Sequence, residues 1–140
     1  MQRIIAAVDG SEESNRAARM AAELARQFDA RLSLVHVIPP MPYPYEDYGL
    51  SKKELQESHR QAAETLVRKA REALGEVKVP VDQRILWGSP AEQLIDAANE
   101  AGVDLVVVGS RGRNAVARLM LGSTSDRVVH GCAKPVLVVR

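Results

Sequence analysis

The chain has 140 residues, 46% of them hydrophobic and 26% charged, which suits one globular domain with its own core. Its 19 basic and 18 acidic side chains leave a net charge of +1, which argues against binding to nucleic acid or to a membrane surface. No apolar stretch is long enough for a membrane span, and residues 1–9 lack a signal-peptide pattern. The single cysteine, Cys132, excludes an intrachain disulfide, and we expect a cytoplasmic protein.

The first part of the chain predicts a strand, a helix and a second strand. The strands cover about residues 3–8 and 32–38, which are short apolar runs. Between them, apolar side chains recur at helical spacing and predict one buried helix face. The members of that face are Ala17, Met20, Ala21, Leu24, Ala25 and Phe28.

Residues 39–50 interrupt this order, because prolines at 39, 40, 42 and 44 exclude regular structure and predict a surface loop. Ser51 and Glu54 then have the spacing of a capping box, which predicts the start of a helix. Gly75 is a predicted helix end. The expected buried face of this helix consists of Leu55, Ala62, Leu66, Ala70 and Ala73.

The rest of the chain predicts three more strands, over residues 79–87, 105–108 and 135–139, with two helices between them. One helix starts with Ser89 as its cap, Pro90 in its first turn and Glu92 three residues after the cap, and it ends at Gly102. The other starts near Ser123 and carries Val128, Val129 and Cys132 on its apolar face. Five alternations of strand and helix predict a single α/β domain over residues 1–140, with a mostly parallel sheet and right-handed crossovers. The spatial order of the strands does not follow from this pattern.

Two loops that leave the carboxyl ends of strands carry the polar residues of interest. One is Asp9-Gly10-Ser11 after the first strand, and the other is the Gly-Ser-Arg-Gly segment 109–112 after the fourth. Ligands of open α/β sheets bind outside these ends, where the strand order reverses. If the two strands are neighbours, both loops face one crevice. Asp9 could then accept from a ribose or base, or hold magnesium through water.

The glycine-rich segment predicts contact with phosphate. Gly109 and Gly112 would let phosphates approach backbone amides, and Arg111 and Arg113 could add charge-assisted bonds. Gly122, Ser123 and Thr124 would offer amides and hydroxyls at a helix start, where the helix dipole favours anions.

A purely structural interpretation of the same residues also holds. A strand that ends in glycine needs no ligand, and Ser123, Asp9 or Ser11 could simply cap a helix. The segment is neither a P-loop nor the dinucleotide-binding fingerprint, since it lacks the lysine of the first and the three spaced glycines of the second.

Several of these residues together resemble the universal stress protein family. The resemblance rests on the segments 8–11 (Val-Asp-Gly-Ser) and 36–38 (His-Val-Ile), and on the pattern Gly-x2-Gly-x9-Gly-Ser/Thr. Gly109, Gly112, Gly122 and Ser123 complete that pattern, which marks the ATP-binding branch of the family. The similarity continues through residues 134–139 and so spans nearly the whole chain.

The resemblance implies a Rossmann-like, open five-stranded parallel sheet in the order 3-2-1-4-5 with helices on both faces. It also implies ATP as the ligand, with magnesium carried by the ATP, and a regulatory, nucleotide-responsive binding module in the stress response. A homodimer through the last strand, Val136–Val139, is implied as well, and an apolar strand at a sheet edge agrees with it. The residues expected to bind the nucleotide are Ala7, Val8, Asp9, Val37, Gly109, Arg111, Gly112, Gly122, Ser123 and Thr124.

Two other functions stay open at this point. One is a slow ATPase or phosphotransferase that uses the same pocket, although no convincing base or nucleophile lies near the loops. The other is a dimerising structural partner that binds no nucleotide. The sequence identifies neither a protein partner nor the preferred nucleotide.

Smaller predictions concern isolated residues. Tyr43, Tyr45 or Tyr48 in the proline-rich loop could stack on a base, or the loop could be solvated. The three histidines, His36, His59 and His130, lack metal-ligand spacing. We expect His36 at the pocket rim or in packing, Cys132 in the core, and Trp87 in packing or in contact with a partner.

Overall fold

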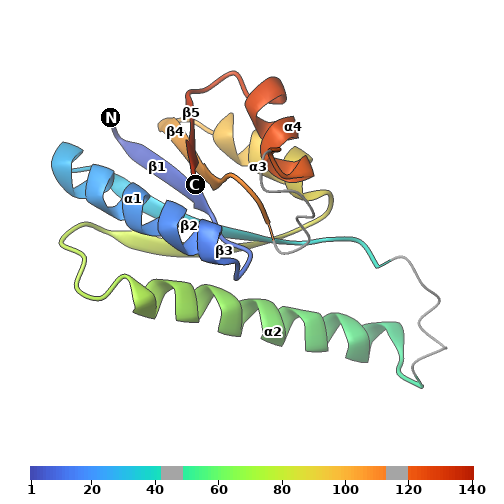
Figure 1. The fold of residues 1–140 in the computed structure, drawn as a ribbon. Coiled ribbons are helices and arrows are strands. Elements are labelled where there is room, and N and C mark those ends of the chain that lie inside the picture. Colours follow the sequence, from blue (N-terminus) through green and yellow to red (C-terminus); the bar gives the residue numbers. More distant parts are fainter. Residues whose placement is uncertain (42–48, 113–119) are drawn as a thin grey trace.

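The computed structural model describes residues 1–41, 49–112 and 120–140, and in these ranges strands and helices alternate along the chain (Figure 1). The strands are β1 (Arg3–Ala7), β2 (Arg31–Ile38), β3 (Val81–Trp87), β4 (Val103–Gly109) and β5 (Val136–Val139). The helices are α1 (Glu12–Phe28), α2 (Lys52–Ala73), α3 (Pro90–Ala98) and α4 (Ser123–Gly131). Tyr43, Tyr45, Tyr48 and Arg113 lie outside the described residues.

The five strands form one parallel sheet in the order β3-β2-β1-β4-β5. This order confirms the arrangement implied by the family resemblance. It places β1 between β2 and β4, with Ala7 opposite Val35 and Ala6 opposite Val107. The chain therefore turns to opposite sides after β1 and after β4, and the loops that follow these strands open at the same edge of the sheet.

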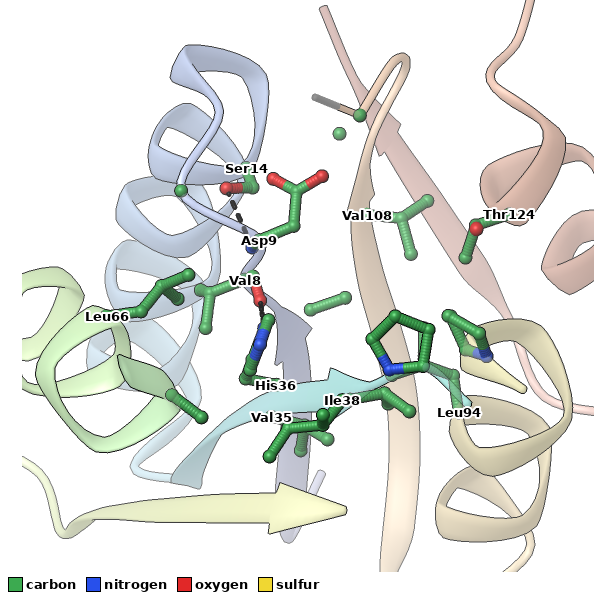
Figure 2. Close-up of a pocket in the computed structure, with 18 of the residues that line it drawn as sticks. Val8, Asp9, Ser14, Val35, His36, Ile38, Leu66, Leu94, Val108 and Thr124 are labelled. Atoms are coloured by element: carbon green, nitrogen blue, oxygen red, sulfur yellow. Dashed lines mark hydrogen bonds between the residues drawn. The ribbon is translucent and has the colours of Figure 1, made fainter. Parts of the chain in front are cut away.

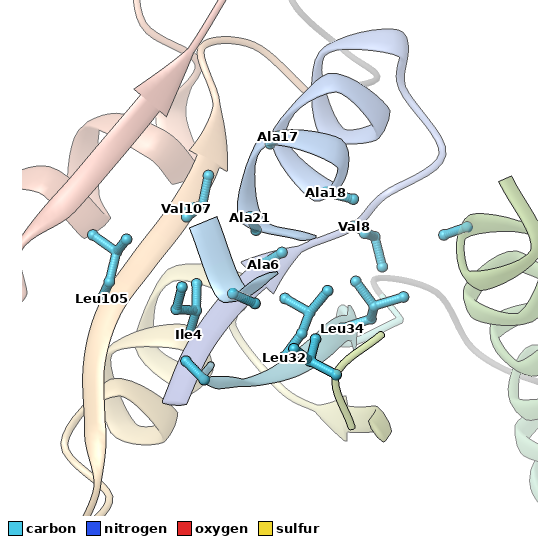
Figure 3. Packing of buried hydrophobic residues seen from close by; sticks show 14 of the residues in the cluster. Ile4, Ala6, Val8, Ala17, Ala18, Ala21, Leu32, Leu34, Leu105 and Val107 are labelled. Atoms are coloured by element: carbon cyan, nitrogen blue, oxygen red, sulfur yellow. The ribbon is translucent and has the colours of Figure 1, made fainter. Parts of the chain in front are cut away.

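Helices cover both faces of the sheet, as Figure 1 shows. Contacts of α1 and α2 with the strands build one core, in which Ile4, Leu34 and Val107 are fully buried (Figure 3). The contacts of α3 and α4 with the other face build a second core around Ile5, Val106 and Val128. Because both faces are covered, residues 105–108 in the middle of β4 form a continuous apolar run.

The buried face of α1 differs from the predicted one. Ala17, Ala18, Ala21 and Ala25 contact the sheet, and their small side chains let the helix approach the strands closely (Figure 3). Met20 and Phe28 are 44% and 53% exposed, so their prediction as core residues was wrong. Helical spacing places both residues at the margin of the apolar stripe, whereas the buried alanines at its centre pack on the sheet and Leu24 packs beside them.

The long helix α2 starts with the predicted capping box. The Glu54 amide donates to Ser51 Oγ at 3.1 Å, and the Ser51 amide donates to Glu54 Oε2 at 2.7 Å. Leu55 and Ala70 are buried as predicted, whereas Ala63 and Val67 take the core positions predicted for Ala62 and Leu66. Ala73 is exposed, and Gly75 follows the helix end with a φ of +66°.

Some element boundaries and packing also differ from prediction. The strand predicted from residue 79 starts at Val81, and α3 ends at Ala98, ahead of Gly102. Cys132 lies just past α4, half-buried against the second core, and Val129 is 37% exposed. Trp87 is 44% exposed at the end of edge strand β3. Within the described ranges, no helix is both long and apolar enough to cross a bilayer.

Candidate functional site

A cavity of about 990 Å³ opens at the carboxyl edge of the sheet, next to the ends of β1 and β4 (Figure 2). This volume lies at the upper end of the range of small-molecule sites. All ten residues predicted to bind a nucleotide line this cavity. The structure thus brings together side chains and backbone from β1, β2, the loop after β4 and the start of α4. This is the single crevice expected if β1 and β4 are neighbours.

The loop after β1 fixes the Asp9 carboxylate. Oδ1 of Asp9 accepts from the Ser11 amide at 2.9 Å, and the Asp9 amide donates to Ser14 Oγ at 3.2 Å (Figure 2). Ser11 in turn caps α1, since its Oγ accepts from the Ser14 amide at 3.1 Å. Gly10 turns the chain with a φ of +85°, in the left-handed region that glycine tolerates. Asp9 is therefore held between the start of α1 and β4, at the wall of the cavity.

Three glycines at the end of β4 and between β4 and α4 leave little room for a side chain, and at Gly109 the obstacle is backbone. A Cβ on Gly109 would lie 2.8 Å from the backbone carbon of Glu13, and one on Gly112 would lie 2.7 Å from Asp9 Oδ2. A Cβ on Gly122 would lie 3.2 Å from the Gly112 amide nitrogen. The close approach to the α1 backbone supports the structural interpretation for Gly109. The close packing also joins the Asp9 loop, segment 109–112 and Gly122 into one wall.

The start of α4 faces the cavity, and no side chain of the described residues caps this end of the helix. Gly122 is the N-cap and makes no side-chain cap bond, so the alternative that Ser123 caps this helix is wrong. Ser123 and Thr124 line the cavity instead, and Ser125 Oγ donates to the Gly109 carbonyl at 2.6 Å. The first-turn amides of a helix have no partners within the helix, and the helix dipole adds partial positive charge there. This end of the cavity suits an anion.

Arg111 lines the cavity but is also paired. Its Nη2 donates to Glu13 Oε1 at 2.8 Å, and the two side chains are 29% and 16% exposed. The sequence predicts contact between Arg111 and a phosphate group, and this role stays a prediction. The prediction did not include the carboxylate of Glu13, which the fold brings from α1.

The other end of the cavity is apolar and carries one backbone amide of interest. Val35, Leu94 and Val108 line it (Figure 2). The Val8 amide donates to the Val35 carbonyl, so Val35 faces β1, and Gly88 donates to the Ile38 carbonyl, so Ile38 faces β3. Backbone groups alternate sides along a strand, so the N–H and C=O of Val37 point to the side that β1 has left. A donor and an acceptor are thus presented next to an apolar surface.

Sequence reasoning missed the wall formed by α2. His59, Ala62, Thr65, Leu66 and Lys69 of this helix line the cavity, and so does Pro90 at the start of α3. Ala62 and Leu66 lie at the margin of the apolar stripe of α2, whose centre is formed by the buried Ala63 and Val67. No local signal in the sequence marks which residues of a helix face a cavity, because only the packing of α2 on β2 and β3 decides it.

His36 lies in this cavity with a fixed tautomer. Its Nδ1 is 2.8 Å from the Val8 carbonyl oxygen, which can only accept, so Nδ1 carries the proton (Figure 2). In the neutral ring Nε2 is then an acceptor. Among the described residues, no three His, Cys, Asp or Glu side chains are grouped to hold a metal ion.

The comparison with known families decides the relationship of this chain. The family model described as the universal stress protein family matches residues 1–140. The chain belongs to the universal stress protein family. It is 39% identical over 138 residues to a universal stress protein of Thermus aquaticus, covering 98% of this chain and 97% of that protein. A universal stress protein of Mycobacterium tuberculosis is 36% identical over 144 residues, and the chain spans 47% of its length.

Solved structures of the family share the fold. Universal stress protein UspA from Lactobacillus plantarum superposes with a TM-score of 0.85 at 25% identity, covering 99% of this chain and 97% of that one. Two more distant members of the fold contain adenine nucleotides. One is a universal stress protein in complex with cAMP (TM-score 0.76, 24% identity), and the other is an Arabidopsis thaliana family protein with AMP bound (TM-score 0.70, 22% identity).

Proposed function

We propose that this universal stress protein binds an adenine nucleotide, foremost ATP, in the cavity between β1 and β4, and acts as a nucleotide-responsive regulatory module. One observation carries the proposal: an anion-favouring helix end, a fixed carboxylate and an apolar wall with a backbone donor and acceptor share one cavity. The adenine nucleotides found in fold relatives support the same ligand class.

The polarity of the cavity suggests how the nucleotide is oriented. Adenine offers a donor and an acceptor on one edge, which match the N–H and C=O of Val37, while its faces suit the apolar side chains of Val35, Leu94 and Val108. Asp9 would accept from the ribose hydroxyls. The phosphates would then lie at Gly112 and at the first turn of α4, with Ser123 and Thr124 donating to them.

Magnesium would enter with ATP rather than bind a dedicated protein site. The cation is held by phosphate oxygens and water in many nucleotide sites, and Asp9 is the carboxylate that lines the cavity within the described residues. When bound, magnesium would neutralise part of the phosphate charge.

We also propose a homodimer through β5. This strand lies at the edge of the sheet, and all four residues of Val136–Val139 are half-buried in the single chain. Val139 accepts from the Ser110 amide of the neighbouring loop, so odd-numbered residues of β5 face β4 and the amide of Val138 faces outward. Val138→Pro should therefore leave the β4 ladder intact and abolish dimerisation, which sedimentation at several concentrations measures. A monomeric wild type would contradict this proposal.

Titration calorimetry with ATP and AMP tests the nucleotide proposal directly. Wild-type protein should bind, and Gly122→Val should not, because the branched side chain would fill the phosphate space beside Gly112. Gly131→Val at the other end of α4 is the control and should bind normally, since a Cβ there meets only the tip of Ile95. Absence of binding by the wild type would contradict the proposal.

A turnover assay separates a binding module from an enzyme. With labelled ATP and magnesium, the purified protein should release phosphate at nearly the same rate as buffer without protein. Fast release that Asp9→Asn removes would instead support an ATPase, since Asp9 is the carboxylate that lines the cavity within the described residues.

A further inference from the structure

Glu13 occupies an unusual position for an acidic residue next to a phosphate-binding region. It belongs to the first turn of α1, and its Cβ lies 2.8 Å from the position a Cβ on Gly109 would take. Its side chain is only 16% exposed. Glu13 is not one of the residues that line the cavity, so it lies behind the wall on which phosphates would rest.

The carboxylate of Glu13 is shared by two arginines. Oε1 accepts from Arg111 Nη2 at 2.8 Å and lies 3.6 Å from Arg16 Nη2. Arg16 also donates from Nε to the Arg140 carbonyl at 2.8 Å, which anchors it away from the cavity. Arg111 is therefore the partner of Glu13 that faces the cavity, and Glu13 neutralises the charge that Arg111 would otherwise present there.

The pairing of Arg111 with Glu13 changes the net charge of the cavity wall. Arg111 and Lys69 are its cationic side chains within the described residues, and Asp9 is its carboxylate. With Glu13 behind Arg111, the wall next to the glycine loop offers an ion pair of zero net charge rather than a free cation. The attraction between Arg111 and a ligand grows with the ligand's negative charge. Neutralisation of Arg111 therefore lowers the affinity for ATP more than the affinity for AMP.

We propose that Glu13 is a positioning residue that sets the selectivity of the site for phosphate number, by holding Arg111 in an ion pair. This inference rests on the proposed function. In the wild type Glu13 keeps the affinities for AMP and ATP close together.

The variant Glu13→Gln tests this role with little change of shape. It removes the negative charge and leaves Arg111 as an unpaired cation with five donors. Affinity for ATP relative to AMP, measured by calorimetry without magnesium, should rise on the order of tenfold. Added salt should reduce the gain, because it screens the charges involved. Glu12→Gln is the matched control: it removes the same charge one residue earlier, from a side chain that is 90% exposed and 3.8 Å from Arg16. Its ATP-to-AMP ratio should stay within about twofold of the wild type.

A double-mutant cycle shows whether Glu13 acts through Arg111. In an Arg111→Gln background the tenfold gain from Glu13→Gln should fall below about threefold, since only direct repulsion remains. An unchanged ATP-to-AMP ratio in Glu13→Gln, with the wild type still binding nucleotide, would overturn the selectivity role alone. A full gain in the Arg111→Gln background would overturn the route through Arg111. A wild type that binds neither nucleotide would overturn the proposed function itself.

Discussion

Two groups of polar atoms in this molecule differ in whether the protein itself supplies their bonding partners. In the first, which we call the Glu100 cluster (Glu100, Arg3 and Arg84), the Glu100 carboxylate accepts from Arg3 at 2.7 Å and from both Nη atoms of Arg84 at 3.0 and 2.6 Å. Nearby, Asp104 accepts from the amides of Gln2 and Arg3. These bonds, above all the one from Arg84, lower the pKa of Glu100, and the backbone bond from Gln2 lowers that of Asp104.

The second group lines the cavity at the carboxyl edge of the sheet. There the chain leaves β1 and β4 toward opposite faces of the sheet, and a space of about 990 Å³ remains at this edge. The first turn of α4 and the backbone of Val37 face this space, whereas the members of the Glu100 cluster are paired with one another. Charges that the protein pairs internally stabilise the fold, whereas polar groups that border a cavity are suited to bind a ligand.

The variant Gly109→Ala tests whether every residue that lines the cavity serves binding alone. Gly109 lines the cavity, yet its substitution should lower stability. The new Cβ would lie 2.8 Å from the backbone carbon of Glu13 and 2.9 Å from the amide nitrogen of Ser14, neither of which can move aside without shifting α1. We expect the free energy of unfolding in urea to fall by about 3 kcal/mol. The control Gly131→Ala has the same 2.8 Å approach, but to the flexible tip of Ile95, and should change stability by less than about 1 kcal/mol.

The variant Gly112→Ala should have the opposite signature, with an effect on binding rather than on stability. Its Cβ would lie 2.7 Å from Asp9 Oδ2, the end of a side chain that can turn away. Displacement of that carboxylate should weaken adenine-nucleotide binding about tenfold by calorimetry, roughly the value of one charge-assisted hydrogen bond. Its unfolding free energy should stay within about 1 kcal/mol of the wild type. Equal loss of stability and affinity would erase the contrast.

The variant Glu100→Gln should lower stability without touching the nucleotide site. It leaves Arg3 and Arg84, which are 22% and 26% exposed, without their shared carboxylate. Because the Glu100 side chain is 40% exposed, solvent screening limits the expected loss to about 1 kcal/mol in chemical denaturation. Calorimetry should give the wild-type affinity for ATP, and a change in that affinity would show that the two groups communicate.

The pH dependence of the same variant gives the smallest expected effect. The folded-state pKa of Glu100 is lowered, first by its bond to Arg84, below the ordinary glutamate value of about 4.3. Its contribution to stability is therefore fully present above that value and is lost as the pH falls through the folded-state pKa. The stability difference between wild type and Glu100→Gln should accordingly shrink between neutral pH and about pH 3. A constant difference would assign the effect to packing.

Much of the fold followed from local patterns. The alternation of apolar strands and amphipathic helices predicted all nine elements found in the described residues, and Ser51 with Glu54 predicted the start of α2. Ser89 is an instructive partial success: the helix begins at Pro90 as predicted, yet Ser89 makes no side-chain cap bond. Proline fixes the backbone of the first turn by itself, so the start of a helix can be predicted without its cap.

Helix faces were predicted less well, because an apolar stripe has neighbours at its margins. Leu66 and Val67 are adjacent in the sequence and equally apolar, but Val67 is buried in the core while Leu66 borders the cavity. Met20 and Phe28 on α1 were likewise predicted to be buried and are exposed. The crossing of each helix over the sheet decides between such neighbours, and helical periodicity alone does not contain that angle.

The sequence by itself determined the α/β class, the elements and the residues of two polar loops, since these depend on side-chain periodicity and on turn chemistry that act over a few residues. Only the tertiary structure decided that Glu13 pairs with Arg111, that α2 forms a wall of the cavity, and that the Val37 backbone faces inward. Each of these depends on residues far apart in the chain. The parallel order of the strands and the packing of helices across them bring such residues together, and no local pattern encodes that geometry.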